Sequence, residues 1–293
     1  MSCITLIGPV SQDTIIKDNY NYKSPGGAVF YQSSVLSSLE INTKAIVTIS
    51  RDDKELLKSF PSNVNLIPIY VKETINFQNI YPDNDPNHRI QKAKVPHNPI
   101  KNIINQIECS KALLLGPLCP YDIPLKTIEE LSILKIPIYL GAQGYLRHLI
   151  ENKIILKPWY GFNKYLKFIN TLFIDQNESA IILGEKHSLE ETARILASFG
   201  PLEVIITCGS RGSIIYSRKS DRVYKIPAFK PEKIEDPTGL GDTYMAAYTA
   251  RKLEIEDPKK CGIFAAAASA LKLENKGSFK GEKNLIEDRC KNK

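Results

Sequence analysis

The sequence predicts an α/β protein whose central sheet is mostly parallel, and three observations support this prediction. Short apolar segments of β character alternate along most of the chain with segments whose small and apolar residues recur at helical spacing. The β segments are apolar throughout, which is typical of parallel strands that helices cover on both faces. The composition, 43% hydrophobic and 24% charged residues over 293 positions, is that of an ordinary soluble globular protein.

The elements follow one another in a regular order. The N-terminal apolar run has no basic leader and ends early at Gly8-Pro9, so we interpret it as a first strand and not as an export signal. The predicted strands, all short and apolar, are Cys3–Gly8, Lys44–Ile49, Ala112–Leu115, Pro137–Leu140, Thr171–Ile174 and Val204–Thr207. The predicted helices, with apolar residues at helical spacing or acidic residues in the first turn, are Ala28–Leu39, Asp52–Phe60, Tyr121–Leu134, Leu189–Phe199 and Tyr244–Leu253.

Two segments interrupt this alternation. Between Asn65 and Val95 apolar residues alternate as they do in strands, around a cluster of turn-forming residues at 82–86. We expect these strands, with part of the segment 13–23, to form a small β lid over the functional site of a single domain that spans residues 1–293. Because the exposed edges of such a lid favour pairing between subunits, a homodimer through the lid is expected. The segment from Gly212 to Phe229 is also rich in β character.

Charge, cysteine content and hydropathy exclude several classes of protein. The net charge of +7 is spread over scattered lysines without arginine clusters, so a solvated surface explains it better than a nucleic-acid-binding face. The six cysteines lie far apart, without a C-x-x-C pair or a nearby histidine, which excludes the common zinc spacings and indicates reduced thiols in a cytoplasmic protein. No apolar stretch approaches the ~18 residues of a membrane span, so no membrane partner is expected.

The most informative segment is D-P-T-G-L-G-D-T at residues 236–243. Gly239 and Gly241 let the backbone approach a ligand closely, and the helix that follows offers free amides to anionic oxygen. Asp242 places a carboxylate beside these amides, in a positive backbone field that should lower its pKa. Such an arrangement suits transfer of a phosphoryl group to an alcohol, since the carboxylate takes the hydroxyl proton while the amides hold the developing charge. The alternative is an ordinary loop in which Asp242 or Thr243 caps the helix.

This segment resembles the C-terminal signature D-T/P-T-G-A-G-D of the ribokinase/PfkB carbohydrate-kinase family, and it lies about 50 residues from the C-terminus, as in that family. The resemblance implies a three-layer α/β/α sandwich and an ATP-dependent kinase. It also implies that Asp242 is the catalytic base and that the backbone amides of Gly239, Leu240 and Gly241 form the anion hole. Leu240 stands where Ala is usual, but only its backbone amide is required.

Residues of the N-terminal half resemble the acceptor-binding side of the same family. Gly8 followed by Asp13 resembles the first strand, whose Asp binds sugar hydroxyls, and S-P-G-G-A at residues 24–28 resembles the first signature, with Gly26 and Gly27 on the substrate side. Tyr31 stands at the position of an Asn that contacts the sugar in the family. Taken without the resemblance, the double glycine is a plain turn into a helix.

Two later segments resemble the nucleotide-binding side. The T-x-G-x-x-G turn at residues 207–212 resembles the turn that lines the nucleotide site, which implies ATP-binding roles for Thr207, Gly209 and Gly212. The run Ala265–Ala270, which includes Ala268, resembles the small-residue helix that flanks the adenine. A tight β-turn and close helix packing explain these two segments equally well.

The middle of the chain departs further from the family pattern. G-A-Q-G-Y-L-R at residues 141–147 resembles the D-x-Q-G-x-x-R stretch of some members, which implies that Arg147 reaches the transferring phosphate, whereas a surface arginine is the alternative. D-Q-N-E at residues 175–178 falls where the family has N-x-x-E, which organises magnesium and phosphate. Glu178 and Asp175 are therefore candidate Mg²⁺ residues, acting through bound water.

The leading hypothesis is a kinase that uses ATP and Mg²⁺ to phosphorylate a hydroxyl of a small sugar, polyol or nucleoside. Thr74–Phe77, followed by Arg89 and by Q-G-Y-L-R at residues 143–147, resembles inositol and nucleoside-type members more than ribokinase itself. We expect the lid to carry Asn76 and Arg89 toward the substrate. The alternative is a kinase-like binding or regulatory protein with little turnover, which Tyr31, Gly141 in place of Asp and the shifted N-x-x-E motif favour. Turnover with a panel of acceptors distinguishes the two hypotheses.

Overall fold

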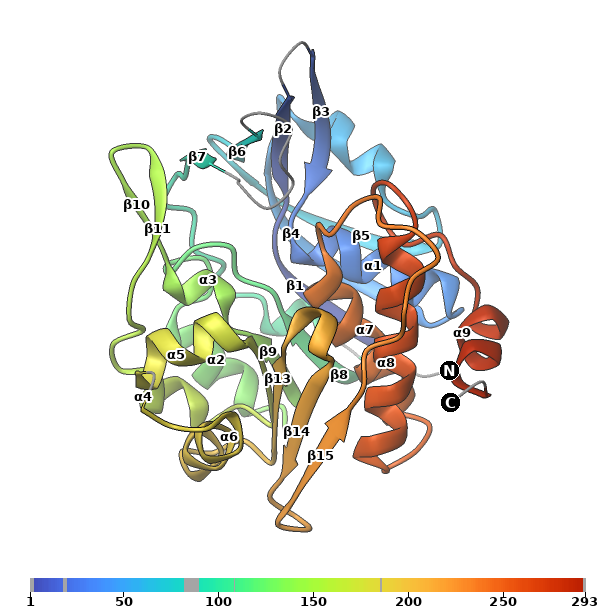
Figure 1. Ribbon diagram of the computed structural model, residues 1–293. Helices are drawn as coiled ribbons and strands as arrows, with labels where there is room; N and C mark the ends of the chain where they lie inside the picture. The colour runs from blue at the N-terminus through green and yellow to red at the C-terminus, as the bar shows by residue number, and fades with distance from the viewer. Residues whose placement is uncertain (1–2, 18–19, 82–89, 108, 185, 292–293) are drawn as a thin grey trace.

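The computed structural model describes residues 3–17, 20–81, 90–107, 109–184 and 186–291. Within them, nine strands form the central sheet, in the order β15-β14-β13-β12-β9-β8-β1-β4-β5 (Figure 1). Neighbouring strands from β13 to β5 are parallel, and the two pairs that involve β14 are antiparallel. The strands are β1 (Cys3–Pro9), β4 (Asn42–Ser50), β5 (Val64–Val71), β8 (Ser110–Leu115), β9 (Ile138–Gly141), β12 (Thr171–Asp175), β13 (Glu203–Thr207), β14 (Ser213–Ser217) and β15 (Arg222–Ile226).

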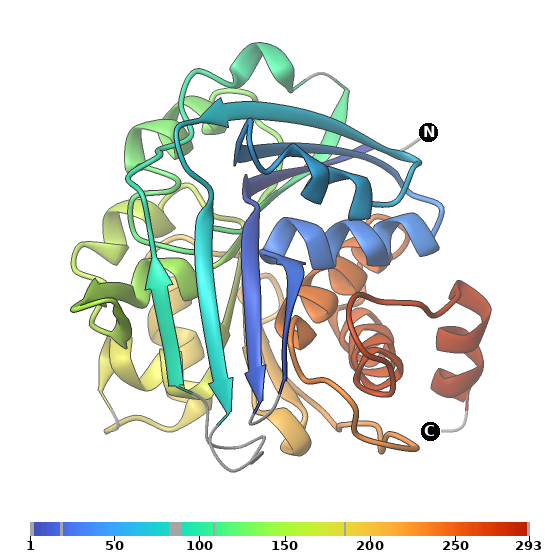
Figure 2. The same ribbon diagram turned by 90° about the horizontal axis from the view of Figure 1, so that it is seen from above.

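Helices cover both faces of this sheet and create the three-layer α/β/α architecture expected from the sequence (Figures 1 and 2). One face carries α1 (Ala28–Ser38), α7 (Leu240–Lys252), α8 (Pro258–Leu273) and, outside α8, α9 (Lys283–Lys291). The other carries α2 (Leu125–Ser132), α3 (Gln143–Leu146), α4 (Phe162–Leu166), α5 (Gln176–Leu183) and α6 (Leu189–Ser198). Short 3₁₀ turns lie at Lys54–Ser59, Ile104–Gln106 and Gly209–Arg211.

The two apolar layers explain why the strands are apolar throughout. In β8, Ala112 and Leu114 belong to the core that contains α1, α7 and α8, whereas Leu113 and Leu115 belong to the core on the opposite face. Successive side chains of a strand point to opposite faces, so a strand covered on both sides has no solvent-facing position for a polar residue.

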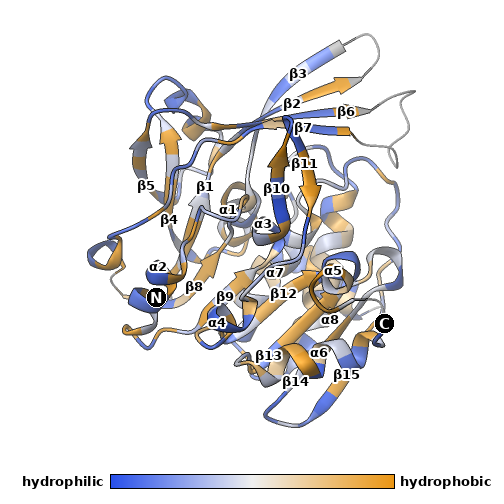
Figure 3. Cartoon of the chain, turned by 90° about the vertical axis from the view of Figure 1, so that its left-hand side faces the viewer, coloured by the Kyte–Doolittle hydropathy of each residue, from blue (hydrophilic) through white to orange (hydrophobic). Residues whose placement is uncertain are grey.

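A second sheet of six strands lies beyond the ends of the central strands, in the order β10-β11-β7-β6-β2-β3 (Figure 3). Its strands are β2 (Ser11–Lys17), β3 (Tyr20–Gly26), β6 (Ile75–Tyr81), β7 (Ile90–Lys94), β10 (Arg147–Ile150) and β11 (Lys153–Leu156). β2 follows β1 after the single residue Val10, so the chain passes directly from the central sheet into this second sheet.

The predicted lid was wrong at its N-terminal end, and one hairpin of the second sheet was missing from the prediction. Residues Val64–Val71 form β5, the edge strand of the central sheet, parallel to β4, and do not join the six-stranded sheet. The six-stranded sheet instead includes the hairpin at residues 147–156, which the sequence did not predict as part of it. Ile67, Ile69 and Val71 alternate with other residues in the sequence, and such alternation is compatible with an edge strand of the central sheet as well as with a lid strand.

Two further differences concern helices. The segment predicted as a helix at 52–60 is a 3₁₀ turn at Lys54–Ser59. Helix α7 begins at Leu240, four positions earlier than predicted, so the signature glycines lie at the helix start and not in a loop before it. Within the described part of the chain, no helix combines the length and the apolar character that crossing a membrane requires.

Candidate active site

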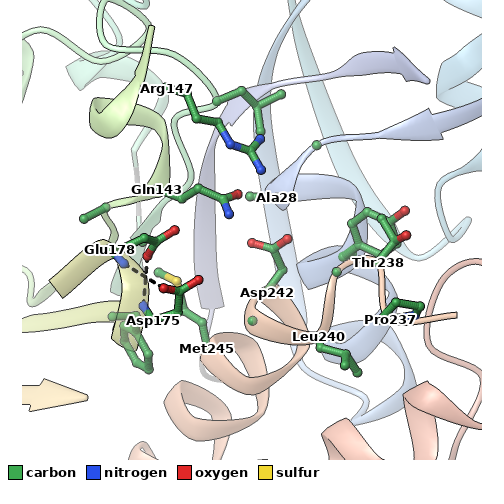
Figure 4. Close-up of a pocket in the computed structure, with 18 of the residues that line it drawn as sticks. Ala28, Gln143, Arg147, Asp175, Glu178, Pro237, Thr238, Leu240, Asp242 and Met245 are labelled. Carbon is green, nitrogen blue, oxygen red and sulfur yellow. Dashed lines mark hydrogen bonds between the residues drawn. The ribbon is translucent and has the colours of Figure 1, made fainter. Parts of the chain in front are cut away.

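A cleft of about 290 Å³ opens where the carboxyl ends of the parallel strands meet the first turn of α7 and the six-stranded sheet (Figure 4). This edge is where open α/β sheets place their ligands. Several distant segments contribute to its walls. The residues that line the cleft include Ser11, Asp13, Gly27, Tyr31, Phe77, Asn79, Gln91, Gln143, Arg147, Asp175, Glu178, Thr207, Thr238, Gly239, Leu240, Gly241 and Asp242.

The signature turn forms the first turn of α7. Gly239 is the N-cap residue with φ 77° and ψ 14°, a left-handed conformation that glycine adopts without strain. A Cβ at this position would also lie 2.4 Å from ring atoms of Tyr31, so the packing requires glycine as well. The Leu240 amide donates a long hydrogen bond to the Pro237 carbonyl, at 3.4 Å. The amides of Gly241 and Asp242 lie in the first turn, where a helix provides no acceptor, and they are better placed to bind an anion.

The alternative interpretation of this segment, in which Asp242 or Thr243 caps the helix, was wrong. The N-cap position belongs to Gly239, and no side chain forms a capping hydrogen bond there. Asp242 is the third residue of α7, and its carboxylate points into the cleft toward Arg147 (Figure 4). The hydroxyl of Thr243 is buried without a hydrogen-bond partner, so it does not cap the helix either.

The electrostatic prediction for Asp242 was also wrong. Burial raises the pKa of its carboxyl from 3.8 to about 6, and the nearby Arg147 guanidinium offsets only part of this effect. The helix terminus was expected to lower this pKa. Loss of water around the carboxylate outweighs that field, because walls from distant parts of the chain enclose the group.

Arg147 lies between the candidate catalytic groups. It follows α3 at the start of β10, and its Cζ atom is 5.9 Å from the centroid of the Phe77 ring. Its positive charge acts to lower the pKa of both Asp242 and Glu178. Arg147 therefore lines the cleft rather than the outer surface, a position from which a guanidinium could contact a phosphoryl group.

Asp175 and Glu178 form a capping box at the start of α5. The Glu178 amide donates to Asp175 Oδ1 at 2.8 Å, and the Asp175 amide donates to Glu178 Oε2 at 2.9 Å (Figure 4). Burial, and next the charge of Asp175, raise the pKa of Glu178 to about 7. Each carboxylate keeps its second oxygen outside the capping box, so this hard oxygen pair fits a magnesium ion that retains most of its water. No group of three or more potential metal ligands is found among the described residues.

The residues expected to bind the acceptor lie together, at the beginning of β2 and at the junction of β3 with α1. Ser11 Oγ donates to Asp13 Oδ1 at 2.7 Å, and both side chains are buried. Gly26 does not line the cleft, but a Cβ there would lie 2.6 Å from the Asp13 carboxyl and from Ser11 Oγ, so Gly26 makes room for this pair. Gly27 lines the cleft and is the N-cap residue of α1. Burial raises the pKa of the Tyr31 hydroxyl, so this side chain stays neutral.

Two lid residues in the cleft were missed. Gln91 Nε2 donates to Asn79 Oδ1 at 2.8 Å, and both side chains line the cavity with Phe77. Asn76, the predicted acceptor contact, points to the opposite face of β6, where its amide donates to Gln12 Oε1 at 3.4 Å. The two-residue period of a strand could have identified Asn79, because it shares a face with Phe77. Arg89, the other predicted lid contact, lies outside the described residues.

The predicted nucleotide-side residues are only partly in this cleft. Thr207 lines it, whereas Gly209, Gly212 and Ala268 do not. Gly212 has φ 92°, and a Cβ there would lie 2.0 Å from the Ile226 carbonyl oxygen, so the turn into β14 itself requires glycine. Ala268 belongs to α8 and is fully buried in the core on that face of the central sheet.

Comparison with known proteins agrees with this fold. Residues 150–283 match the model of the pfkB family carbohydrate kinases. A cytidine kinase of Thermococcus kodakarensis is 26% identical over 255 residues, which cover 84% of this chain and 87% of that protein. A nucleoside kinase of Methanocaldococcus jannaschii is 40% identical over 74 residues, so the aligned part is 25% of this chain and only 24% of that protein.

A solved structure extends the likeness to nearly the whole chain. It is a pyrophosphate-dependent kinase in the ribokinase family, complexed with a pyrophosphate analog and myo-inositol. The two structures superpose with a TM-score of 0.83 at 25% sequence identity, over 97% of this chain and 99% of the other. These matches confirm the resemblance to the ribokinase/PfkB carbohydrate-kinase family and the fold predicted from the signature, and the matched proteins are named kinases.

Proposed function

We propose that this protein transfers the γ-phosphoryl group of ATP to a hydroxyl of a sugar, polyol or nucleoside, with Asp242 as the general base. The arrangement that carries the proposal is the Asp242 carboxylate, which faces Arg147 across the cleft beside the free amides of the first turn of α7. A base, a planar cation and a set of amide donors at one point are what phosphoryl transfer to an alcohol requires.

The elevated pKa of Asp242 strengthens this proposal. A carboxylate with a pKa of about 6 is ionised at neutral pH, yet it is a stronger base than an ordinary aspartate. As the acceptor oxygen forms its bond to phosphorus, its proton passes to Asp242, and the bond from phosphorus to the leaving diphosphate breaks. Arg147 and the amides of Gly241 and Asp242 stabilise the negative charge on the transferring group.

Asp175 and Glu178 would hold magnesium through water at the other end of the cleft. Bound there, the ion neutralises phosphate charge. On the acceptor side, Asp13, positioned by Ser11, accepts hydrogen bonds from substrate hydroxyls, and the Asn79–Gln91 pair offers further polar contacts. We expect these side chains to select the acceptor, because they line the cleft from the strands of the six-stranded sheet, opposite the signature turn.

Pyrophosphate is a second candidate donor, and two observations favour testing it. Gly209, Gly212 and Ala268, the residues expected to hold the nucleoside part of ATP, do not line the cleft. A structure that superposes over nearly the whole chain is that of a pyrophosphate-dependent kinase. A donor without a nucleoside needs only the phosphate-binding end of the site.

The decisive screen combines two donors with a panel of acceptors. Magnesium-ATP and magnesium-pyrophosphate are each incubated with ribose, myo-inositol, cytidine, adenosine and related compounds, and the phosphorylated product is detected by mass spectrometry. We expect one donor to give acceptor-dependent product. Acceptor binding by calorimetry without product under either donor would instead support the kinase-like binding protein.

A further inference from the structure

A lysine lies fully buried behind the signature turn. Lys272 is the penultimate residue of α8, and its side chain is 0% exposed. Lysine is rarely buried to this extent unless its charge is paired. Lys272 is not one of the residues that line the cleft, so its charge acts there only through the groups that it contacts.

The ammonium group of Lys272 contacts Asp236, the residue that begins the signature turn. Its Nζ donates to the Asp236 backbone carbonyl at 2.8 Å and lies 3.4 Å from the carboxylate Oδ2. The same nitrogen lies 5.9 Å from the centroid of the Tyr31 ring. One buried cation thus contacts the signature turn and the tyrosine ring that packs against Gly239.

Asp236 transmits this contact to the rest of the turn. Its Oδ1 accepts a hydrogen bond from the Thr238 amide at 2.9 Å, and its Oδ2 accepts one from the Gly277 amide at 3.1 Å. Burial acts to raise the pKa of Asp236, but the Lys272 ammonium and the Thr238 amide outweigh it, so this pKa lies below its ordinary value. This favours the charged form of Asp236, which in turn offsets part of the effect by which burial lowers the pKa of Lys272.

We propose that Lys272 is a positioning residue for phosphoryl transfer, whose buried ammonium holds Asp236 and Tyr31 and thereby sets the position of the amides at residues 239–242 and of the Asp242 carboxylate. This inference rests on the kinase function proposed above. A buried ion pair contributes little net stability compared with well-packed apolar side chains, so the gain from this one lies in the geometry that it imposes. Displacement of catalytic groups by about 1 Å costs about 100-fold in rate.

The test compares the buried Lys272 with a partly buried lysine of the same protein, and both form an ion pair. Lys272→Met keeps most of the length of the side chain and removes the charge. Lys252→Met is the matched control, because Lys252 donates to Glu203 Oε1 at 2.6 Å, is 19% exposed and lies outside the cleft. With the acceptor found in the screen, we expect Lys272→Met to lower kcat about 10- to 100-fold while the KM for the acceptor changes less than about threefold. The control should keep kcat within about twofold.

A second variant addresses charge directly and does not depend on how Lys272→Met folds. Lys272→Ala leaves a cavity that methylammonium can enter, and we expect this ion to raise the kcat of the variant at least about fivefold. Rescue by methylammonium chloride but not by sodium chloride at the same concentration would show that the ammonium cation itself is required. A purely structural role predicts no selective rescue, because stability lost with the methylene groups is not returned by a salt.

A binding measurement separates this inference from the proposed function. Calorimetry with inorganic pyrophosphate needs no turnover, and Lys272→Met should weaken pyrophosphate binding at least about threefold relative to Lys252→Met. A wild-type protein without turnover in the screen refutes the kinase function, whatever Lys272 does. An active wild type would overturn the positioning role if folded Lys272→Met kept normal kcat, or if Lys272→Ala recovered equally in both salts.

Discussion

Neutralising Asp242 should make the protein more stable at neutral pH. Burial raises the pKa of this carboxyl from 3.8 to about 6, so the folded protein holds a charge in a place that disfavours it. One pKa unit corresponds to about 1.4 kcal/mol, which gives an upper bound of about 3 kcal/mol. Because the carboxylate faces an open cleft that admits water, we expect Asp242→Asn to raise the free energy of unfolding by about 1–3 kcal/mol at pH 8.

The pH dependence of this gain follows from the sign of the shift. A group whose pKa is raised in the folded state contributes stability that is fully present below the unfolded pKa, near 3.8, and is lost as pH rises through about 6. The wild type therefore loses this contribution between about pH 4 and pH 7, while the Asn variant does not. The difference in stability between the two proteins should be small at pH 4 and constant above pH 7.

Urea unfolding followed by far-UV circular dichroism at pH 4.5, 6 and 8 measures this difference. Asp221→Asn is the control, because the pKa of this exposed carboxylate is lowered by its hydrogen bond with Arg194, so neutralising it should not stabilise the protein. Equal stability of wild type and Asp242→Asn at pH 8 would refute the reasoning, as would a stabilisation of the same size at all three pH values.

Two further predictions concern catalysis. The value of kcat/KM should rise with pH through an apparent pKa near 6 and then level off, because Asp242 must be ionised to act as the base. The same rise should be seen in Glu178→Gln. A kcat/KM that does not depend on pH between 5 and 8 would contradict the assignment of Asp242 as the base. Asn79→Ala should raise the KM for the acceptor about 2- to 10-fold with kcat nearly unchanged, as expected for the loss of one hydrogen-bonding group. Asn76→Ala, on the opposite face of the same strand, should leave this KM unchanged, and equal effects of the two changes would show that the strand faces the cleft differently.

The sequence predicted those parts of the fold that depend on local pattern. The apolar strands and the helices between them could be predicted from periodicity. The strands are apolar because their side chains pack into an apolar core on each face of the sheet. The part of the predicted lid at residues 65–71 was assigned to the wrong sheet because its alternating apolar residues are compatible with either sheet. Whether β5 pairs with β4 or with the lid is decided by long-range contacts that periodicity does not contain.

The same distinction applies to the site. The backbone of the signature turn could be predicted because its glycines and its helix start are consecutive in the chain. The pKa of Asp242 could not, because its sign depends on how far cleft walls from other segments exclude water, and Arg147 is 95 positions away in the 293-residue sequence. Asn79 and Gln91 meet only because β6 and β7 pair in that register, and Lys272 reaches Asp236 only through the packing of α8.

The central claim, that Asp242 is the base of a phosphotransferase, is tested most directly by the turnover of Asp242→Asn. The substitution keeps the shape of the side chain and removes the basic carboxylate, and general-base assistance is worth roughly 10²–10⁴ in rate. With the acceptor and donor identified in the screen, we expect kcat of the folded variant to fall by about that factor while donor affinity stays within about threefold. A folded Asp242→Asn protein with near-normal kcat would contradict the assignment.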